Sequence, residues 1–349
     1  MKNIIKIKTC SLKIILFLFI ITIFSETLIS ASEKIPESLV MLPKGINAVI
    51  VEKNKQRIYL YSSNNNLIYK KFDFPCSTGE VSGIKLRQGD KKTPEGVYFF
   101  TDKYEDKDLT PVYGKKAFPI NYPNFIDKIE KRKGSAIWLH GTNKRLKPMD
   151  SNGCIVMQNN EILQISPFIA LGKTPIILTN KIFYQKKENL NKQKYEILKI
   201  LIKWIKTINE ESYDDYIQFY DSNYLPETKW WTTWQKIKKK FKKQGLKFLI
   251  LTDNIGIYKE NHIFVLFFDM NVKLLENSMK IGKTKLFLKK ENNIYKITGD
   301  FFENFYRQKV SKKNCLINAV EKLVNNLKTN KEYIKKIKTS NYISLKEQN

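Results

Sequence analysis

Residues 137–162 of this chain read IWLHGTNKRLKPMDSNGCIVMQNNEI, and this stretch decides the fold of the region around it. Its apolar start is rich in residues that favour strands and ends at His140, which Gly141 follows. A polar loop then leads to Cys154, the last residue of a Ser-Asn-Gly-Cys group. The pattern predicts a strand that ends at His140 and a following loop that can bring Cys154 within its reach.

The residue types in this stretch can support nucleophilic catalysis. A thiol becomes a reactive thiolate near neutral pH when a base takes its proton, and His140 stands 14 residues before Cys154. Gly153 would let the backbone turn tightly and direct amide N–H groups at a developing oxyanion. A buried free cysteine and a hydrogen-bonded core histidine would give the same pattern. The spacing alone leaves both interpretations open.

Residues 46–180 are predicted to form a mainly β domain with one short helix at 160–171. Polar turns such as SSNNN at 62–66 separate the apolar runs. The predicted strands are INAVIVEK, RIYLY, NLIYKKF, GVYFF, AIWLH and TPIIL. The next segment, KIFYQKKENLNKQK at 181–194, is polar and charged and is predicted to be a linker.

From Tyr195 onwards the apolar period becomes that of a helix. One helical face is formed by Ile197, Leu198, Leu201, Trp204, Ile205 and Ile208. The strands expected after the helices are FLILTD, GIYKE, HIFVLFFDMNV, KTKLFLKK and IYKITGDFF. Helices followed by strands predict an α+β domain over 195–304. Residues 305–349 have a helical period that becomes Lys-rich, and we expect a helical basic tail.

The N-terminus has the order of features of a secretory signal. Lysines precede the run IILFLFIITIF at 14–24, and the small residues Ser30-Ala31-Ser32 follow it. Eleven apolar residues are fewer than the roughly 20 that span a bilayer, which favours cleavage over a retained anchor. We therefore expect a signal peptide at 1–32, an N-terminal segment at 33–45, and a location in the periplasm or cell wall.

The net charge restricts the partners. The 349 residues include 62 Lys+Arg and 34 Asp+Glu, which gives +28. Without 1–32 the chain would keep about +25 by the same counting. Outside the cytoplasmic membrane, the basic C-terminal half would meet glycan or other anionic surfaces. Export argues against nucleic acid, the other common partner of such charge.

The counts of histidine and cysteine exclude further classes. Two His and four Cys do not supply the usual ligand sets of zinc sites, and no phosphate-binding glycine motif is found, so no metal and no cofactor are expected. Cys76 is predicted to be a buried thiol, with a disulfide to Cys315 as the alternative. His262 is expected to be structural.

Several ordered motifs resemble the YkuD-type L,D-transpeptidase family. HG followed by SNGCIVM is similar to the family signature, and the similarity extends over about residues 46–180. The other matching pieces are Ser77-Thr78-Gly79, KTPEGVYF at 92–99, AFPINYPN at 117–124 and RKGSAIWLHG at 132–141. The resemblance implies a YkuD-like β-sandwich with a short helix, and cysteine acyl transfer on peptidoglycan stem peptides.

The resemblance also implies roles for individual residues. Cys154 would be the nucleophile, His140 its base and later its acid, and the Gly141 carbonyl would orient the imidazole. Gly153 and Cys154 would supply oxyanion amides, and Ser151 would shape the loop. Further loop and substrate-binding residues suggested by the resemblance are Asn152, Tyr122, Trp138 and Thr142.

Two positions depart from the family pattern. Many members have His where Asn152 stands, so His140 is left as the one imidazole base. Many have Arg where Val156 stands, so the positive charge that these members carry two residues after the nucleophile is missing here. Family membership also implies acylation of Cys154 by β-lactams, carbapenems especially.

The C-terminal half resembles an NTF2-like domain in the spacing of its aromatic residues. Such domains follow the catalytic domain in some cell-shape L,D-carboxypeptidases of this family, which favours hydrolysis of the stem tetrapeptide to a tripeptide. The alternatives are a transpeptidase that forms 3–3 cross-links or attaches or detaches wall-linked protein, and a non-catalytic wall-binding protein.

Overall fold

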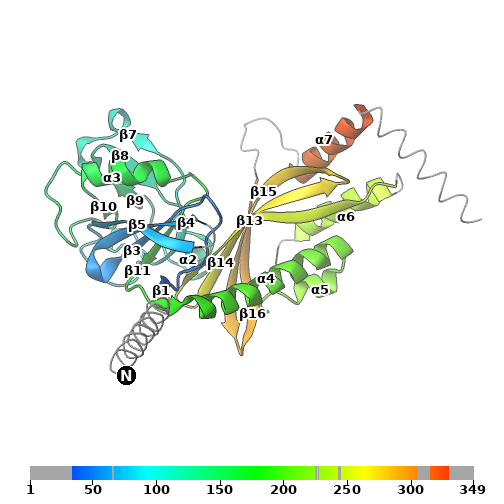
Figure 1. The fold of residues 1–349 in the computed structure, drawn as a ribbon, viewed down its shortest axis with the longest axis horizontal. Coiled ribbons are helices and arrows are strands. Elements are labelled where there is room, and N and C mark those ends of the chain that lie inside the picture. The colour runs from blue at the N-terminus through cyan, green and yellow to red at the C-terminus, as the bar shows by residue number, and fades with distance from the viewer. Residues whose placement is uncertain are drawn as a thin grey trace, which may run out of the picture.

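Figure 1 shows the computed structural model of the chain. The described residues are 34–64, 67–224, 226, 228–242, 245–304 and 315–329. The predicted signal peptide at 1–32 and the end of the predicted tail, 330–349, lie outside them. None of the described helices is long and apolar enough to cross a membrane. A β-rich part, blue to green in Figure 1, lies beside a long twisted sheet flanked by helices.

The β-rich part contains a five-stranded sheet of β3 (Ala48–Glu52), β4 (Arg57–Asn64), β5 (Leu67–Pro75), β6 (Gly96–Phe99) and β11 (Pro175–Thr179). Their order is β5-β4-β3-β11-β6, and only the β3–β11 pair is parallel. Every residue of β3 and β11 is buried. Strands that are covered on both faces have continuous apolar sequences rather than alternating ones. This explains the apolar runs in β3 and β11.

A smaller sheet packs against the first. It consists of β7 (Tyr104–Glu105), β8 (Lys116–Pro119), β9 (Trp138–His140) and β10 (Ile155–Val156), in the order β10-β9-β8-β7. Both sheets contribute to one apolar core, whose members include Val49, Ile58, Tyr98, Phe118, Leu139, Ile155 and Ile176. The prediction of a mainly β domain is therefore confirmed.

Two short helices complete this part. The helix predicted at 160–171 is α3 (Asn159–Ile165), which is shorter because Pro167 cannot continue an α-helix and Ser166–Phe168 forms a 3₁₀ turn. Helix α2 (Phe125–Ile129) was not predicted. It begins with a capping box in which Asn124 Oδ1 accepts from the Asp127 amide at 3.0 Å.

The C-terminal half has helices first and strands after, as predicted for an α+β arrangement. Its helices are α4 (Lys187–Glu210), α5 (Tyr213–Ile217), α6 (Thr228–Lys242) and α7 (Cys315–Thr329). Its antiparallel strands are β13 (Phe248–Glu260), β14 (Ile263–Leu274), β15 (Asn277–Glu291) and β16 (Ile294–Asn304). The described part of the predicted tail, α7, packs Val320 and Leu323 into the core and is part of the fold.

The number of strands in this half differs from the prediction. FLILTD and GIYKE are two pieces of one strand, β13, so four strands replace the five expected. The pairing of β13 with β14 shifts between Asp253 and Gly256. An irregularity of this kind interrupts the period of two that sequence reasoning depends on, because an extra residue is inserted into one strand.

The N-terminal segment and the predicted linker both belong to regular structure. β1 (Lys34–Pro36) pairs with β12 (Tyr184–Lys186). β2 (Leu39–Met41) pairs with β13 and is the edge strand of the C-terminal sheet, in the order β16-β15-β14-β13-β2. The segment 181–194 contains β12 and the first turns of α4 rather than irregular chain.

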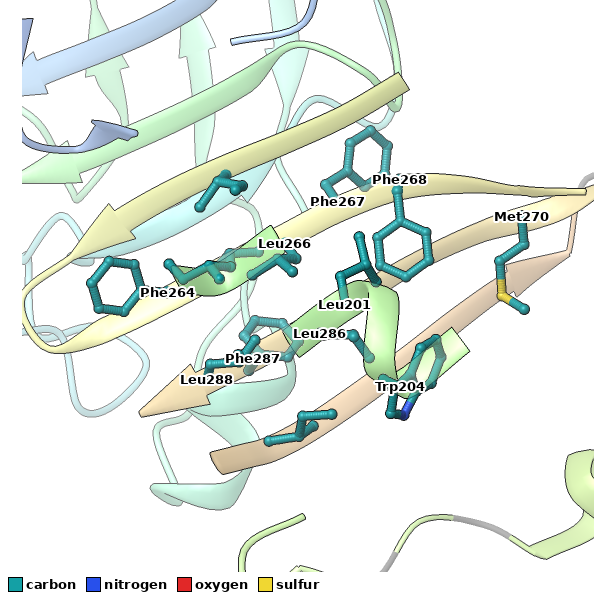
Figure 2. Packing of buried hydrophobic residues seen from close by; sticks show 14 of the residues in the cluster. Leu201, Trp204, Phe264, Leu266, Phe267, Phe268, Met270, Leu286, Phe287 and Leu288 are labelled. Atoms are coloured by element: carbon teal, nitrogen blue, oxygen red, sulfur yellow. The ribbon is translucent and has the colours of Figure 1, made fainter. Parts of the chain in front are cut away.

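The two parts of the molecule share one apolar cluster, shown in Figure 2. Leu201 and Trp204 of α4 pack on the sheet, with the Trp204 ring 6.3 Å from that of Phe268. The next residue along β14, Phe267, has its ring centroid 4.6 Å from Phe99 of β6. Alternation along β14 therefore connects the helix on one side with the β-rich part on the other. Each such ring contributes about 1.5–3 kcal/mol by burial, which holds the two parts together.

Candidate functional site

The predicted catalytic pair lies at two neighbouring strands, with His140 at the end of β9 and Cys154 just before β10. β9 and β10 pair in parallel, with Leu139 opposite Ile155 and His140 opposite Val156. Leu139 and Ile155 are fully buried in the core. Because side chains alternate between the faces of a strand, His140 and the residue just before β10, Cys154, project to the opposite face.

The imidazole of His140 is held in one tautomer. Its Nδ1 lies 2.7 Å from the backbone oxygen of Gly141, and a carbonyl only accepts, so Nδ1 carries the proton. Nε2 therefore presents a lone pair. Burial lowers the pKa of His140, against the hydrogen bond to Gly141, which raises it. The ring is neutral near pH 7 and can act as a base.

The thiol of Cys154 is partly exposed and free. Sγ lies 3.6 Å from the carbonyl oxygen of Ala136, to which it donates. Burial raises the pKa of the thiol, while a backbone hydrogen bond at Trp138 and the charge of Lys85 lower it. The resting pair is a neutral thiol and a neutral imidazole. Their mutual hydrogen bond is not formed among the described residues, and such contacts often tighten only when substrate binds.

The loop before Cys154 requires glycine at position 153. Gly153 has φ +120°, and a Cβ there would lie 2.7 Å from the backbone oxygen of Lys92. Ser151 Oγ accepts from the Gly153 amide at 3.1 Å and donates to the Cys154 carbonyl at 2.7 Å. Ser151 thus shapes the loop. The Gly153 amide is already engaged, so the Cys154 amide is the better placed oxyanion donor of the two.

Sequence reasoning missed a set of polar groups beneath this loop. Thr93 Oγ1 donates to the Gly153 carbonyl at 2.9 Å and accepts from the Gly79 amide at 2.9 Å. The buried Lys53 donates to the Thr93 carbonyl at 2.8 Å and pairs with Glu95 at 2.9 Å. Thr93 and Glu95 belong to the KTPEGVYF motif, which was the available signal. No sequence signal indicates that Lys53 is buried, because lysine side chains are usually exposed.

Aromatic side chains line one side of His140. Tyr113 packs on His140 at 5.0 Å and on Trp138 at 4.9 Å between ring centroids, and Tyr104 packs on Trp138 at 5.5 Å. We call Tyr104, Tyr113 and Trp138 the aromatic wall. Two of its members come from residues 103–115, for which the sequence indicated no position.

The remaining predicted site residues are spread over different environments. Thr142 is half-buried just after Gly141, and its Oγ1 accepts from the Lys144 amide at 3.1 Å. Asn152 is exposed in the nucleophile loop. Tyr122 is only 6 % exposed and packs on Tyr98 in the core, so its placement does not favour a contact with substrate.

The structure also describes the surroundings of Cys76 and His262. Cys76 is a buried free thiol, so the alternative of a disulfide to Cys315 is not formed. Burial raises the pKa of Cys76 far above the ordinary range, which makes it inert. Within the described ranges, no cluster of His, Cys, Asp and Glu could hold a metal ion. His262 is exposed in the turn between β13 and β14.

Comparison with known proteins supports the resemblance. Residues 46–178 match the YkuD family model, described as the L,D-transpeptidase catalytic domain. "Putative L,D-transpeptidase YafK" from Escherichia coli K12 is 30 % identical over 128 residues, 36 % of this chain and 48 % of that protein. The chain thus matches about half the length of this curated relative.

Two solved structures are similar over both parts of the molecule. Bdellovibrio bacteriovorus Bd1075 has a TM-score of 0.65 and 24 % identity, over 79 % of this chain and all of that one. The helical cell shape determining protein Pgp2 from Campylobacter jejuni has a TM-score of 0.58 and 25 % identity, over 73 % and 91 %. At 24 % identity, the similarity to Bd1075 concerns the fold alone.

Proposed function

From an L,D-transpeptidase catalytic domain at residues 46–178, we propose that this protein is a cysteine acyl-transfer enzyme acting on peptidoglycan stem peptides. The observation that carries the proposal is the position of His140 at the end of β9 and of Cys154 just before its parallel partner β10, with His140 Nδ1 hydrogen-bonded to the Gly141 carbonyl and Nε2 left as the base. A histidine held only for structure would not need one defined tautomer beside a free, partly exposed thiol.

The first half of the reaction forms a thioester. His140 Nε2 takes the proton of the Cys154 thiol as sulfur attacks the carbonyl carbon of the third residue of the stem. Amide N–H groups of the nucleophile loop, that of Cys154 first, stabilise the oxyanion. The bond to the fourth residue, D-alanine, breaks, and its amine takes the proton from the imidazolium. Burial lowers the pKa of His140, which makes this imidazolium a stronger acid.

The second half decides the activity. If water attacks, it gives a proton to Nε2, the thioester breaks, and the products are a tripeptide and the restored thiol. If an amine of another stem attacks, the product is a 3–3 cross-link. We favour hydrolysis, an L,D-carboxypeptidase, because the similarity to the helical cell shape determining protein Pgp2 extends over both parts of the chain. An NTF2-like identity of the C-terminal part belongs to the same proposal.

The proposal includes location and ligands. Export across the cytoplasmic membrane would bring the enzyme to the periplasm or cell wall, where its substrate is found. The basic C-terminal half would contact glycan or another anionic surface. A carbapenem would acylate Cys154, because its strained carbonyl meets the same thiol and oxyanion site.

The test is digestion of disaccharide-tetrapeptide and of intact sacculi, with products identified by mass spectrometry. We compare the wild type with Cys154→Ala, and use Cys76→Ala as a matched control that removes a buried thiol with no role in the proposed reaction. We expect tripeptide from the wild type and the control and none from Cys154→Ala. New 3–3 dimers would show that the enzyme is a transpeptidase and would contradict the favoured hydrolysis. Equal products from all three proteins would contradict the proposed enzymatic activity and support the alternative of a non-catalytic wall-binding protein.

A further inference from the structure

A buried lysine lies beside the nucleophile loop. Lys85 is only 3 % exposed, and its Nζ donates to Asp90 Oδ1 at 2.6 Å and to the Arg87 carbonyl at 3.1 Å. Asp90 in turn accepts from the amides of Leu86, Arg87 and Lys92 at 2.8, 3.1 and 3.2 Å. Burying an ammonium is costly unless it is paired and hydrogen-bonded. The ion pair with Asp90 and the hydrogen bond to the Arg87 carbonyl therefore hold this side chain in one place.

The loop that carries Lys85 is attached to the segment leading to β9. The carbonyl of Leu86 accepts from the Lys133 amide at 2.9 Å. Gly134 has φ +127°, and a Cβ on it would lie 3.0 Å from Cε of Lys85, so the lysine stem runs directly against this glycine. Two residues later, the Ala136 carbonyl accepts from the Cys154 thiol. Lys85 thus packs beneath the segment that receives the resting thiol.

The charge of Lys85 acts on that thiol. This charge lowers the pKa of Cys154 and so favours the thiolate, whereas burial of the thiol, the larger influence, raises that pKa. His140 is neutral at rest and contributes no charge. The ammonium of Lys85, whose stem lies against Gly134, is therefore a cation placed to stabilise the thiolate before substrate binds.

We propose that Lys85, fixed by Asp90, is a positioning residue that stabilises the Cys154 thiolate and so sets the reactivity of the nucleophile. The inference rests on the proposed function in that Cys154 is its nucleophile. It goes further because it assigns a source of positive charge beside the segment whose Ala136 carbonyl accepts from the thiol. Lys85 does not contact the reacting atoms. It acts through its charge and through the segment that it supports.

The groups around Lys85 keep fixed charges over the useful pH range. Burial tends to raise the pKa of Asp90, but the hydrogen bond from Lys85 and those from backbone amides lower it to about 2. Tyr122 lies against the same glycine, and burial first, then Asp127 and Asp90, raise its pKa, so it stays neutral. Between about pH 5 and 10, the titration of Cys154 and His140 is therefore not mixed with that of these neighbours.

The experiment measures the rate of Cys154 alkylation by iodoacetamide from pH 5 to 10, read by mass spectrometry of the peptide that contains Cys154. Lys85→Met removes the charge and keeps the length of the side chain. Lys91→Met is the matched control, because Lys91 lies in the same loop, is exposed, and loses the same charge. We expect Lys85→Met to raise the midpoint pH by at least about 0.5 units, and Lys91→Met to leave it unchanged.

A second variant separates charge from folding. Asp90→Asn keeps the cation and removes its partner, so the midpoint is expected to stay or fall, although both variants lose stability. A thermal unfolding curve is recorded for each protein. If Lys85→Met does not fold, the double variant Lys85→Gln with Asp90→Asn replaces the pair by neutral hydrogen-bonding groups and should show a smaller rise, because loss of the Asp90 carboxylate partly offsets loss of the cation. A midpoint that is unchanged in the folded charge-removal variant overturns the inference.

The readout does not depend on peptidoglycan. If the midpoint shifts but stem peptides are not cleaved, the inference about Lys85 holds and the proposed substrate fails. If stem peptides are cleaved and the midpoint does not shift, the enzyme is confirmed and Lys85 is only structural.

Discussion

Tyr113 packs edge-on against the imidazole of His140, with ring centroids 5.0 Å apart and ring planes at 80°. The contact joins the loop at 103–115 to the end of β9, two segments that are separate in the sequence. It limits the orientations open to the base from the side that its Gly141 hydrogen bond does not control. The aromatic wall is therefore part of the machinery that positions His140.

Removal of this ring should reduce activity without removing any reacting group. An aromatic pair is worth about 0.5–1.5 kcal/mol, so Tyr113→Ala is expected to lower kcat/KM on tetrapeptide about 3- to 10-fold, and Tyr113→Phe to stay near the wild type. Tyr69→Ala, which removes an exposed tyrosine of β5, is the control. An effect of Tyr113→Phe as large as that of Tyr113→Ala would mean that the hydroxyl, not the ring, matters.

Gly153→Ala should damage both folding and activity. A side chain at φ +120° is strained, and its Cβ would meet the Lys92 carbonyl at 2.7 Å. Strain alone costs about 1–3 kcal/mol, and the collision would displace Cys154. Gly45→Ala is the matched control, since Gly45 has φ +74° with open space around it. Thermal unfolding should show a clearly larger loss for Gly153→Ala, and equal losses would argue against the collision.

Thr93→Val tests the support under the nucleophile loop. The substitution keeps the shape but leaves the Gly153 carbonyl and the Gly79 amide without their partner, at about 1–3 kcal/mol for each buried group. Thr174, also fully buried and bonded to Ala170 and Phe168, lies outside the site. We expect both valine variants to lower Tm and only Thr93→Val to lower kcat. A normal kcat in Thr93→Val would remove this residue from the site.

The pH profile should report the environment of His140. Burial lowers its pKa below the usual 6.5, so the imidazole stays neutral, and able to act as base, to a lower pH than an exposed histidine. The acidic limb of kcat/KM is therefore expected to have its midpoint below about pH 6.5. A midpoint clearly above that value would mean that the protonated ring is stabilised in the free enzyme.

The same shift has a consequence for stability. The unfolded chain binds a proton at His140 at a higher pH than the folded chain does, so stability rises with pH between the folded and unfolded pKa values. This contribution is complete above the unfolded value and is lost as the pH falls through the window. His140→Gln should show a weaker loss of stability on going from pH 7 to pH 5, measured by urea unfolding.

Much of the site could be predicted because its chemistry is local in the sequence. HG at the end of an apolar run and SNGC before the next one identified His140, Gly141, Ser151 and Cys154 as candidates, and the structure brings all four together. Tyr122 was also suggested, but it lies in the core. A tyrosine in a motif that resembles a family pattern can serve packing as readily as binding, and the sequence carries no measure of its exposure.

The order of strands and helices follows from periodicity, since one face of each element must be apolar to be buried, and the ranges 46–180 and 195–304 were predicted on that basis. The way in which these two parts pack against each other was not predicted. β2 joins the distant β13, Phe99 packs on Phe267, and Lys85 packs against Gly134 through contacts between residues far apart in the chain. Local patterns record which face of an element is buried, whereas the partner on that face is chosen by packing and charge in three dimensions. Only the folded chain therefore revealed the aromatic wall, the Thr93 support and the buried cation.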